Sequence, residues 1–465
     1  MPVVDRPVVP APRRDRRRTA SVVAAGLALV VAATACTDAD GVEDDRLVIS
    51  VGDKPSAGTP EELAFWETRV AQFEEQHPDI RIDGSEVAYD PQRYTALLAG
   101  DDVPTVLLVP FTEPQGMLAR GEVAEISGAL AATGLGDVVN PDLQPLVSDG
   151  AGGVYGVPVS AYAMGLVYNR ALFEEAGLDP STPPRTWDEV RDMAGQISRR
   201  TDAAGFGHMG AGNFGGWILT AETYGFGGRV QDEQGELTLT EGPLEELLEV
   251  LRGMREDGSA DPQTGYTSEA IAQNFAGGRL GMYVAAPDVY GQVVDVGELP
   301  PEDFGMGAMP RGGDADAYAS LTGGTVAVVS PTADAAEQRA AMEWIEFFHL
   351  ERYVDRDAAL AEVEAQRTVE NSSLGLPALS PVAPEAYDRW LSWVADEVDV
   401  PLGNFAGYTA TLGDAVEPEP RRKAQLVYGE LDGLVQAVLG REDVDVAELV
   451  AETERTLAED LDRDG

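Results

Sequence analysis

Cysteine and histidine are almost missing from this chain of 465 residues, and basic side chains are scarce. The single cysteine, Cys36, excludes a disulfide framework and a thiolate cluster. The histidines, His77, His208 and His349, lack the close spacing of a helical zinc motif, so we expect no metal and no cofactor. The 33 basic and 81 acidic residues give a formal net charge of −48, which disfavours nucleic acid and anionic lipid surfaces as partners.

The acidic residues are spread along the whole chain instead of gathering in one segment. This distribution favours a solvated surface or a salt-rich habitat over a binding site for a cationic ligand. Hydrophobic residues make up 44% of the chain and aromatic residues 7%, as in folded globular proteins. The length suits one globular unit with two lobes, each with its own core.

The N-terminal segment has the pattern of a secretory signal. Arginines stand at positions 13, 14, 16, 17 and 18, and a stretch of apolar or small residues, 19–35, ends directly before Cys36. That stretch is shorter than the roughly 20 apolar residues of a membrane-spanning helix. We therefore expect residues 1–35 to be a cleaved signal peptide. The arginines fit both general secretory and twin-arginine export, and they do not choose between the two routes.

The first part of the mature chain alternates between strands and helices. Three apolar runs read as strands, namely Leu47–Val51, the run around Ile80 and Ile82, and Thr105–Val109. Leu63, Trp66, Val70 and Phe73 recur at helical spacing before Pro78, which makes Trp66 a core residue. The alternation predicts a parallel sheet with helices on its faces. Because ligands bind beyond the carboxyl ends of such strands, residues 52–54 and 110–113 should share one edge.

A series of short motifs runs through the rest of the chain. Thr186 and Glu189 have the spacing of a capping box at the start of a helix whose Trp187 we assign to the core. The motifs are Phe73–Ile80 (FEEQHPDI), Tyr155–Pro158 (YGVP), Leu166–Arg170 (LVYNR), Phe173–Leu178 (FEEAGL), Thr186–Glu189 (TWDE), Phe275–Met282 (FAGGRLGM), Met309–Gly312 (MPRG) and Gly323–Gly324. In this order they resemble the family 1 extracellular solute-binding proteins of ABC importers.

The resemblance implies an α/β, two-lobed periplasmic-binding-protein-like fold of type II, with lobes joined by hinge crossings. Crossings are expected near Val159–Tyr162, Leu321–Gly324 and Ser373–Leu376. The implied boundaries are residues 46–160 and 322–373 for lobe 1, and residues 161–321 and 374–465 for lobe 2. Closure of the two lobes around a ligand would produce the form that the importer recognises.

The residues before Cys36 are similar to the bacterial lipobox, although Ala33 stands where a leucine is usual. The resemblance implies that Cys36 becomes the first residue of the mature protein and carries fatty acyl chains such as palmitate. Residues 36–45 would then be a lipidated tether that holds a monomer on the extracytoplasmic face of the cell membrane. Its partners would be the transmembrane subunits of the importer.

A sugar ligand requires aromatic faces for its ring and polar groups for its hydroxyls. By resemblance, the ligand-binding candidates are Asp53, Lys54, Thr112, Glu113, Tyr162, Trp217, Asp288, Tyr290, Gly323, Gly324, Tyr408, Arg421 and Tyr428. Asp53 and Lys54 are similar to a Gly-Asp-Lys segment of sugar-binding members, or they form a solvent-facing turn. Thr112 and Glu113 depart from an acid–arginine pair in those members, so a different ligand is expected. The aromatic candidates fit the core equally well, and the two glycines fit a bend.

Other functions are left with weaker support. A secreted glycoside hydrolase needs a pair of carboxylates, which 81 acidic residues supply by chance. The segment Gly205–Gly210 fits the dinucleotide fingerprint, but it follows polar residues 199–202, and we interpret it as a loop. A binding protein for a polyamine, a peptide or a phosphorylated polyol remains an alternative, although Asp53, Glu113 and Asp288 would disfavour a phosphate.

Overall fold

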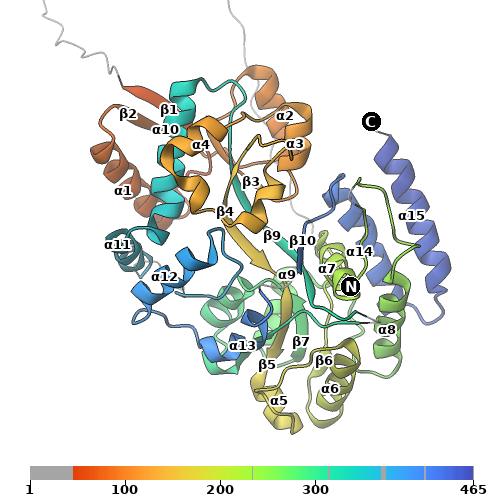
Figure 1. The fold of residues 1–465 in the computed structure, drawn as a ribbon. Coiled ribbons are helices and arrows are strands. Elements are labelled where there is room, and N and C mark those ends of the chain that lie inside the picture. Colours follow the sequence, from red (N-terminus) through yellow and green to blue (C-terminus); the bar gives the residue numbers. More distant parts are fainter. Residues whose placement is uncertain (1–45, 233, 313–314, 368–372, 413–414, 464–465) are drawn as a thin grey trace, which may run out of the picture. The chain divides into compact units, whose positions relative to one another are not determined.

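The computed structural model describes residues 46–465, except 233, 313–314, 368–372, 413–414 and 464–465. The predicted signal peptide and the predicted lipidation site, Cys36, lie outside the described residues. In Figure 1, two α/β lobes are built around separate β-sheets. Two of the strands carry the chain between the lobes.

The first sheet contains the strands that the sequence predicts. Its members are β1 (Leu47–Val51), β2 (Ile80–Gly84), β3 (Val106–Pro110), β4 (Val157–Ala163), β9 (Ala319–Val329) and β10 (Ala415–Glu417). Strand β1 lies parallel to β2 and β3, which confirms the predicted parallel arrangement. Strand β9 then pairs antiparallel with both β3 and β4, and parallel with β10.

Helices cover the faces of the first sheet. They include α1 (Pro60–Gln76), α2 (Pro91–Gly100), α3 (Pro114–Arg120), α4 (Ser127–Thr133), α10 (Ala335–Ile345), α11 (Arg356–Gln366) and α12 (Pro384–Val394). The predicted apolar stripe of α1 packs against α10, where Trp66 lies 6.4 Å and Phe73 lies 5.2 Å from Trp344, measured between ring centroids. Trp66 is only 7% exposed, so its assignment to the core is confirmed.

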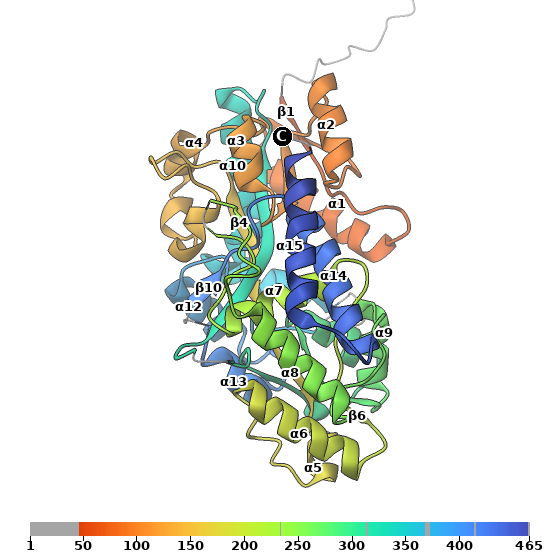
Figure 2. The same ribbon diagram turned by 90° about the vertical axis from the view of Figure 1, so that its right-hand side faces the viewer.

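The second lobe has a smaller sheet, in the order β6 (Ala204–Phe206), β7 (Leu280–Ala285), β5 (Gly165–Asn169) and β8 (Phe304–Gly307). Its helices are α5 (Arg170–Ala176), α6 (Trp187–Arg200), α7 (Phe214–Gly225), α8 (Leu244–Glu256), α9 (Ser268–Ala276), α13 (Ala406–Thr409), α14 (Ala424–Gly440) and α15 (Val446–Asp462). Figures 1 and 2 show α14 and α15 side by side. The predicted capping box of Thr186 and Glu189 begins α6, and Trp187 is buried.

One interpretation of a motif was wrong. Gly205–Gly210 does not lie wholly in a loop, because Ala204–Phe206 forms strand β6, parallel to β7. The polar residues before it belong to the end of α6 and the turn that follows. An edge strand of three residues is too short for its apolar pattern to stand out in the sequence.

The lobes are connected along the paired strands β4 and β9. Tyr162 lies opposite Gly323, and Ala161 lies opposite Gly324. Strand β4 passes through Met164 into β5, and the Ser320 hydroxyl donates to the Met164 carbonyl at 2.8 Å. The Thr322 hydroxyl donates to the Tyr162 carbonyl at 3.0 Å. These bonds hold the two connecting strands together. The residue boundaries that we expect for the two lobes stay a prediction.

Candidate functional site

A cavity of about 260 Å³ opens beyond the carboxyl end of β3, and residues from both lobes line it. Phe111, Thr112 and Gln115 come from the loop after β3 and from α3, while Arg229 follows α7. The segment Glu417–Arg421, which begins in β10, closes another side. We call this space the interlobe cavity. Its position agrees with the rule that ligands bind beyond the carboxyl ends of parallel strands.

The first lobe contributes a carboxylate that is fixed by neighbouring hydroxyls. Glu113 stands at the N-cap of α3, and its side chain accepts hydrogen bonds from Tyr89 at 2.6 Å and from Thr112 at 3.2 Å. Both donors come from side chains near the carboxyl end of the sheet. The carboxylate is therefore held in one orientation before any ligand arrives.

The second lobe contributes Trp217, whose position depends on the start of α7. The Asp432 carboxylate, on α14, accepts hydrogen bonds from the backbone N–H groups of Asn213 and Gly216, both at 2.8 Å. These bonds satisfy two donors that a helix leaves free at its first turn. The Trp217 ring then lies 6.1 Å from the Tyr162 ring in an edge-to-face arrangement.

Glu419 interacts with residues from both lobes. The pKa of Glu419 is raised to about 8, chiefly by burial, while a hydrogen bond from Trp217 opposes the shift and the Glu113 charge adds to it. At neutral pH the carboxyl therefore holds a proton and presents an O–H donor beside the cavity. We refer to Tyr89, Glu113, Tyr162, Trp217 and Glu419 as the cleft cluster.

The glycines of β9 make room for the cleft cluster. A Cβ atom on Gly323 would lie 2.2 Å from the Tyr162 hydroxyl oxygen. Gly324 has a φ of +155°, and a Cβ atom there would lie 2.2 Å from the Ser160 carbonyl oxygen. Its own carbonyl accepts a hydrogen bond from the Phe111 N–H at 3.1 Å. Larger residues at these two positions would displace Tyr162 or break the pairing of β4 with β9.

Several predicted ligand-binding residues lie elsewhere. Tyr290 is buried against Phe304, Tyr408 is buried and donates to the Ala163 carbonyl at 2.8 Å, and Tyr428 is buried behind the cleft cluster. Arg421 is exposed and lines the interlobe cavity. Asp288 is exposed, and its charge contributes to the raised pKa of Tyr162. The structure thus brings Thr112, Glu113, Tyr162, Trp217 and Arg421 together, and it leaves the three tyrosines in the core.

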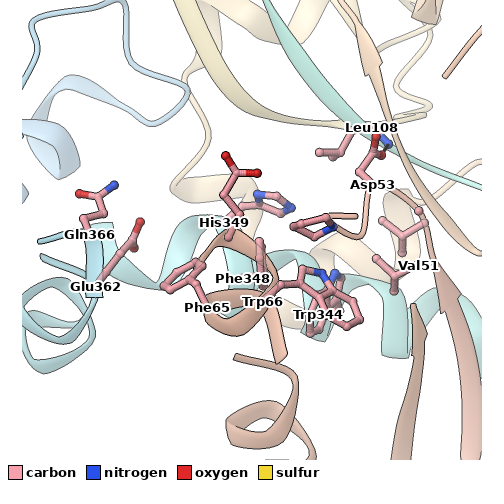
Figure 3. Close-up of a pocket in the computed structure, with 14 residues that line it drawn as sticks. Val51, Asp53, Phe65, Trp66, Leu108, Trp344, Phe348, His349, Glu362 and Gln366 are labelled. Atoms are coloured by element: carbon pink, nitrogen blue, oxygen red, sulfur yellow. Dashed lines mark hydrogen bonds between the residues drawn. The ribbon is translucent and has the colours of Figure 1, made fainter. Parts of the chain in front are cut away.

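Asp53 lies at a different cavity, of about 320 Å³, which Figure 3 shows. Asp53 has a φ of +60°, and its carboxylate accepts a hydrogen bond from the Leu108 N–H at 3.1 Å. Burial raises the pKa of Asp53, and this hydrogen bond opposes the increase. The Lys54 ammonium lies 5.5 Å from the centre of the Trp66 ring. The turn after β1 is thus tied to its neighbours and not a free solvent loop.

Two members of the cleft cluster were missed in the sequence. Tyr89 follows β2 in a segment without a motif, and Glu419 stands in an alternation of acid and proline, Glu417–Pro420. With 81 acidic residues in the chain, a single buried one gives no signal. Within the described residues, no group of three or more histidine, cysteine, aspartate or glutamate side chains could hold a metal ion.

Comparison with known proteins assigns the chain to a family. The family profile described as bacterial extracellular solute-binding protein matches residues 57–352, which is more than half of the chain. A binding protein of Brucella abortus (strain 2308) is 28% identical over 262 residues, which cover 53% of this chain and 60% of that protein. The sn-glycerol-3-phosphate-binding periplasmic protein UgpB of Pectobacterium atrosepticum is 23% identical over 295 residues, 59% of this chain and 64% of the relative. The chain therefore spans less than two thirds of these curated relatives.

Solved structures extend the likeness over most of the chain. The cyclic α-maltosyl-1,6-maltose binding protein of Arthrobacter globiformis superposes with a TM-score of 0.69 at 21% identity, covering 90% of this chain and 100% of that one. UgpB of Mycobacterium tuberculosis, in complex with glycerophosphocholine, gives a TM-score of 0.67 at 20% identity, covering 90% and 98%. These likenesses establish the two-lobed fold of type II periplasmic binding proteins. In the part of the chain that the structure describes, no helix is long and apolar enough to span a membrane.

Proposed function

Because the chain belongs to the bacterial extracellular solute-binding protein family, we propose that it captures a carbohydrate outside the cytoplasm and delivers it to an ABC importer. Members of this family are binding proteins, so we assign the chain a binding role and not a catalytic one. The proposed ligand lies in the interlobe cavity, and closure of the two lobes around it produces the form that the transmembrane subunits recognise.

The composition of the cleft cluster supports a neutral, hydroxylated ligand. Tyr162 and Trp217 offer aromatic surface to a sugar ring. Glu113 accepts hydrogen bonds from ligand hydroxyls, and protonated Glu419 donates one. A site with both acceptors and donors matches hydroxyl groups, and Arg421 in the lining of the interlobe cavity adds further donors. This pairing of Glu113 with Glu419 is the observation that carries the proposal.

A phosphorylated polyol is the main competitor, because UgpB relatives are named for sn-glycerol 3-phosphate. The charges of Glu417 at the interlobe cavity and of the nearby Glu113 oppose it, since both would repel a phosphate. Arg229 and Arg421 could attract a phosphate, but the Arg229 guanidinium lies 2.5 Å from the Glu417 carboxylate. Carbohydrate is therefore the better fit.

The anchoring and the assembly state belong to the same proposal. We propose that Cys36, outside the described residues, is acylated and holds the protein on the extracytoplasmic face of the cell membrane. The protein would act as a monomer, with the importer's transmembrane subunits as its partners.

A thermal-shift screen tests the proposal. Mono- and oligosaccharides are compared with sn-glycerol 3-phosphate, glycerophosphocholine, a polyamine and a short peptide. We expect a carbohydrate to increase the free energy of unfolding by RT ln(1 + [L]/Kd) and so to raise the melting temperature. The carbohydrate should be recovered intact afterwards. Stabilisation by a phosphorylated or cationic compound alone would overturn the ligand assignment, and release of a cleaved product would indicate a hydrolase.

Trp217→Ala tests the site itself. We expect carbohydrate binding to weaken about tenfold to a hundredfold, because an aromatic contact and the hydrogen bond to Glu419 are lost, on the order of 1.4 to 2.8 kcal/mol. Calorimetric titration measures the change. Trp393→Ala is the matched control, since Trp393 is half-buried like Trp217 but packs near α11. Equal affinities of the two variants would place the ligand away from the cleft cluster.

A further inference from the structure

A cavity of about 510 Å³ lies between α12, which covers the first sheet, and α13 of the second lobe. Pro377, Leu379 and Tyr387 line the side formed by α12 and the segment before it. Leu402 and Leu412, which lie in the chain before and after α13, line the opposite side. We call this space the α12–α13 cavity. Its volume and its mostly apolar walls are typical of small-molecule sites.

The α12–α13 cavity lies apart from the interlobe cavity. Strand β9 pairs with β3 along one edge and with β4 along the other. The interlobe cavity opens beyond the end of β3, whereas α13 is attached to β4, because the Tyr408 hydroxyl donates to the carbonyl of Ala163, the last residue of β4. Figure 1 shows α12 to the left of β4 and β9, and β10 and α14 to their right. Asp142 is the only described residue that lines both cavities.

The wall in front of α12 is held in place by hydrogen bonds to the first lobe. Val382 forms a β-bridge with Val139. The Asn140 backbone N–H donates to the Pro381 carbonyl at 2.8 Å, and its side-chain amide donates to the Ser380 carbonyl at 3.0 Å. Asn140 is itself buried. This wall is therefore ordered without a ligand, as a pre-formed site requires.

The charges at the α12–α13 cavity are of one sign. Asp142 and Asp388 line it, and its described lining contains no lysine, arginine or histidine. At the interlobe cavity, Glu417 is paired with Arg229, whereas neither Asp142 nor Asp388 forms an ion pair with a described residue. The Tyr387 ring adds an aromatic face, which also attracts a cation. The cavity therefore favours a positive group and disfavours a carboxylate or a phosphate.

We propose that the α12–α13 cavity is a second ligand site, which takes a small apolar amine, that is, one ring or short apolar body with a single protonated amino group. The apolar body would pack on Leu379, Leu402 and Leu412, and the ammonium group would lie toward Asp142 and Asp388. A polyamine lacks the apolar body, and a sugar would leave most of its hydroxyls without partners on these walls.

An occupant of this site should affect the interlobe cavity, and this part of the inference rests on the proposed function. The paired strands β4 and β9 connect the lobes, and both cavities have walls from elements of both lobes. A rotation about these strands that widens the cavity beside β4 narrows the cavity beyond β3. An amine that keeps the α12–α13 cavity wide should therefore favour closure around the carbohydrate, and the coupling should act equally in both directions.

Calorimetric titration with phenethylamine tests the site. Phenethyl alcohol and hydrocinnamate have the same ring and nearly the same size, but the first is uncharged and the second is an anion. We expect the wild type to bind the amine at least about tenfold more tightly than either. Asp388→Asn should weaken amine binding about twofold to fivefold, since an exposed carboxylate contributes modestly. Leu402→Arg should weaken it at least about tenfold, because a guanidinium group then occupies the place of the ligand's cation.

Each variant has a matched control. Leu402 is 46% exposed, so an arginine there does not disturb the core, and Val354→Arg adds the same charge at a residue that is 39% exposed and does not line the cavity. Glu385→Gln removes a charge from α12, as Asp388→Asn does, at a residue outside the lining. Both controls should bind phenethylamine as the wild type does. Melting without ligand shows that every variant is folded.

The outcomes separate the amine site from the coupling and from the proposed function. Absence of phenethylamine binding, equal binding of the three probes, or wild-type affinity of Leu402→Arg for the amine would overturn the site. The carbohydrate that the thermal-shift screen identifies is then titrated with and without saturating phenethylamine. We expect at least about threefold tighter binding with the amine in the wild type and no change in Leu402→Arg. An unchanged carbohydrate affinity would overturn the coupling and leave the amine site. If no carbohydrate binds, the proposed function fails and the coupling fails with it, while the amine titrations still decide on the site.

Discussion

Glu222 and Glu419 both lie in parts of the chain that the fold shields from bulk water, but their surroundings differ. Glu222, on α7, is fully buried, and its carboxylate lies 3.0 Å from Nε2 of His208. Glu419 lines the interlobe cavity, and the charge that acts on it comes from another acid, Glu113. Glu222 has a hydrogen-bond partner inside the protein, whereas Glu419 has no oppositely charged partner among the described residues.

The partner of Glu222 is itself fully bonded. Nδ1 of His208 lies 2.5 Å from the Met209 carbonyl, which can only accept, so Nδ1 donates, and Nε2 shares a hydrogen bond with the Glu222 carboxyl group. Burial alone would lower the pKa of His208, but the Glu222 charge and hydrogen bond raise it. The pair is thus a buried, hydrogen-bonded pair with a structural role. A buried acid without such a partner, like Glu419, is the better candidate for contact with a ligand.

The largest effect is expected from His208→Leu. This change leaves the Glu222 carboxyl group buried without its hydrogen-bond partner, which should lower the free energy of unfolding by about 3–5 kcal/mol. Urea denaturation measures the loss. Ligand affinity of the folded protein should stay as in the wild type, because neither residue lines a described cavity. The double variant His208→Leu/Glu222→Leu should recover most of the stability; a double variant as unstable as the single one would show that the buried pair is not the cause.

Glu419→Gln, in contrast to His208→Leu, should make the protein more stable at high pH. The folded-state pKa of about 8 lies above the ordinary value, so the wild type should lose stability as the pH rises from about 4.5 to 8, by up to about 1.4 kcal/mol per pH unit. The amide copies the protonated acid and should remove this dependence. Denaturation at pH 5, 7 and 9 measures it. Parallel pH profiles of variant and wild type would mean that Glu419 ionises as it does in water.

The predictable part of the fold is the part with strong local signals. The apolar run of β1, the stripe on α1 and the capping box of α6 all appear where the sequence predicts them. The antiparallel entry of β9 into the first sheet depends instead on contacts between residues more than 200 positions apart. Local patterns contain no information on such pairing.

The candidate site was predictable only where a residue follows a strand or a motif. Thr112 and Glu113 became candidates because they follow β3, and the structure places them near the interlobe cavity and the cleft cluster. Tyr290 and Tyr408 are buried, which the sequence does not reveal, because an aromatic residue near a motif has the same local sequence whether its ring faces a cavity or the core. Glu419 was hidden among the 81 acids, since burial and not residue type makes it distinctive.

Asp432, a third acid shielded from bulk water, tests whether a residue can orient the ligand site in addition to stabilising the fold. Asp432 accepts from two backbone N–H groups at the start of α7, the helix that carries Trp217. Asp432→Asn should cost about 1–2 kcal/mol of stability, because charge-assisted hydrogen bonds are weakened, and should also weaken carbohydrate binding severalfold. Asp445→Asn is the matched control, since Asp445 caps α15 through the Glu448 N–H, away from the cleft cluster. The control should lose some stability and no affinity; if both variants keep wild-type affinity in calorimetric titration, the cap on α7 supports the fold alone and does not orient Trp217.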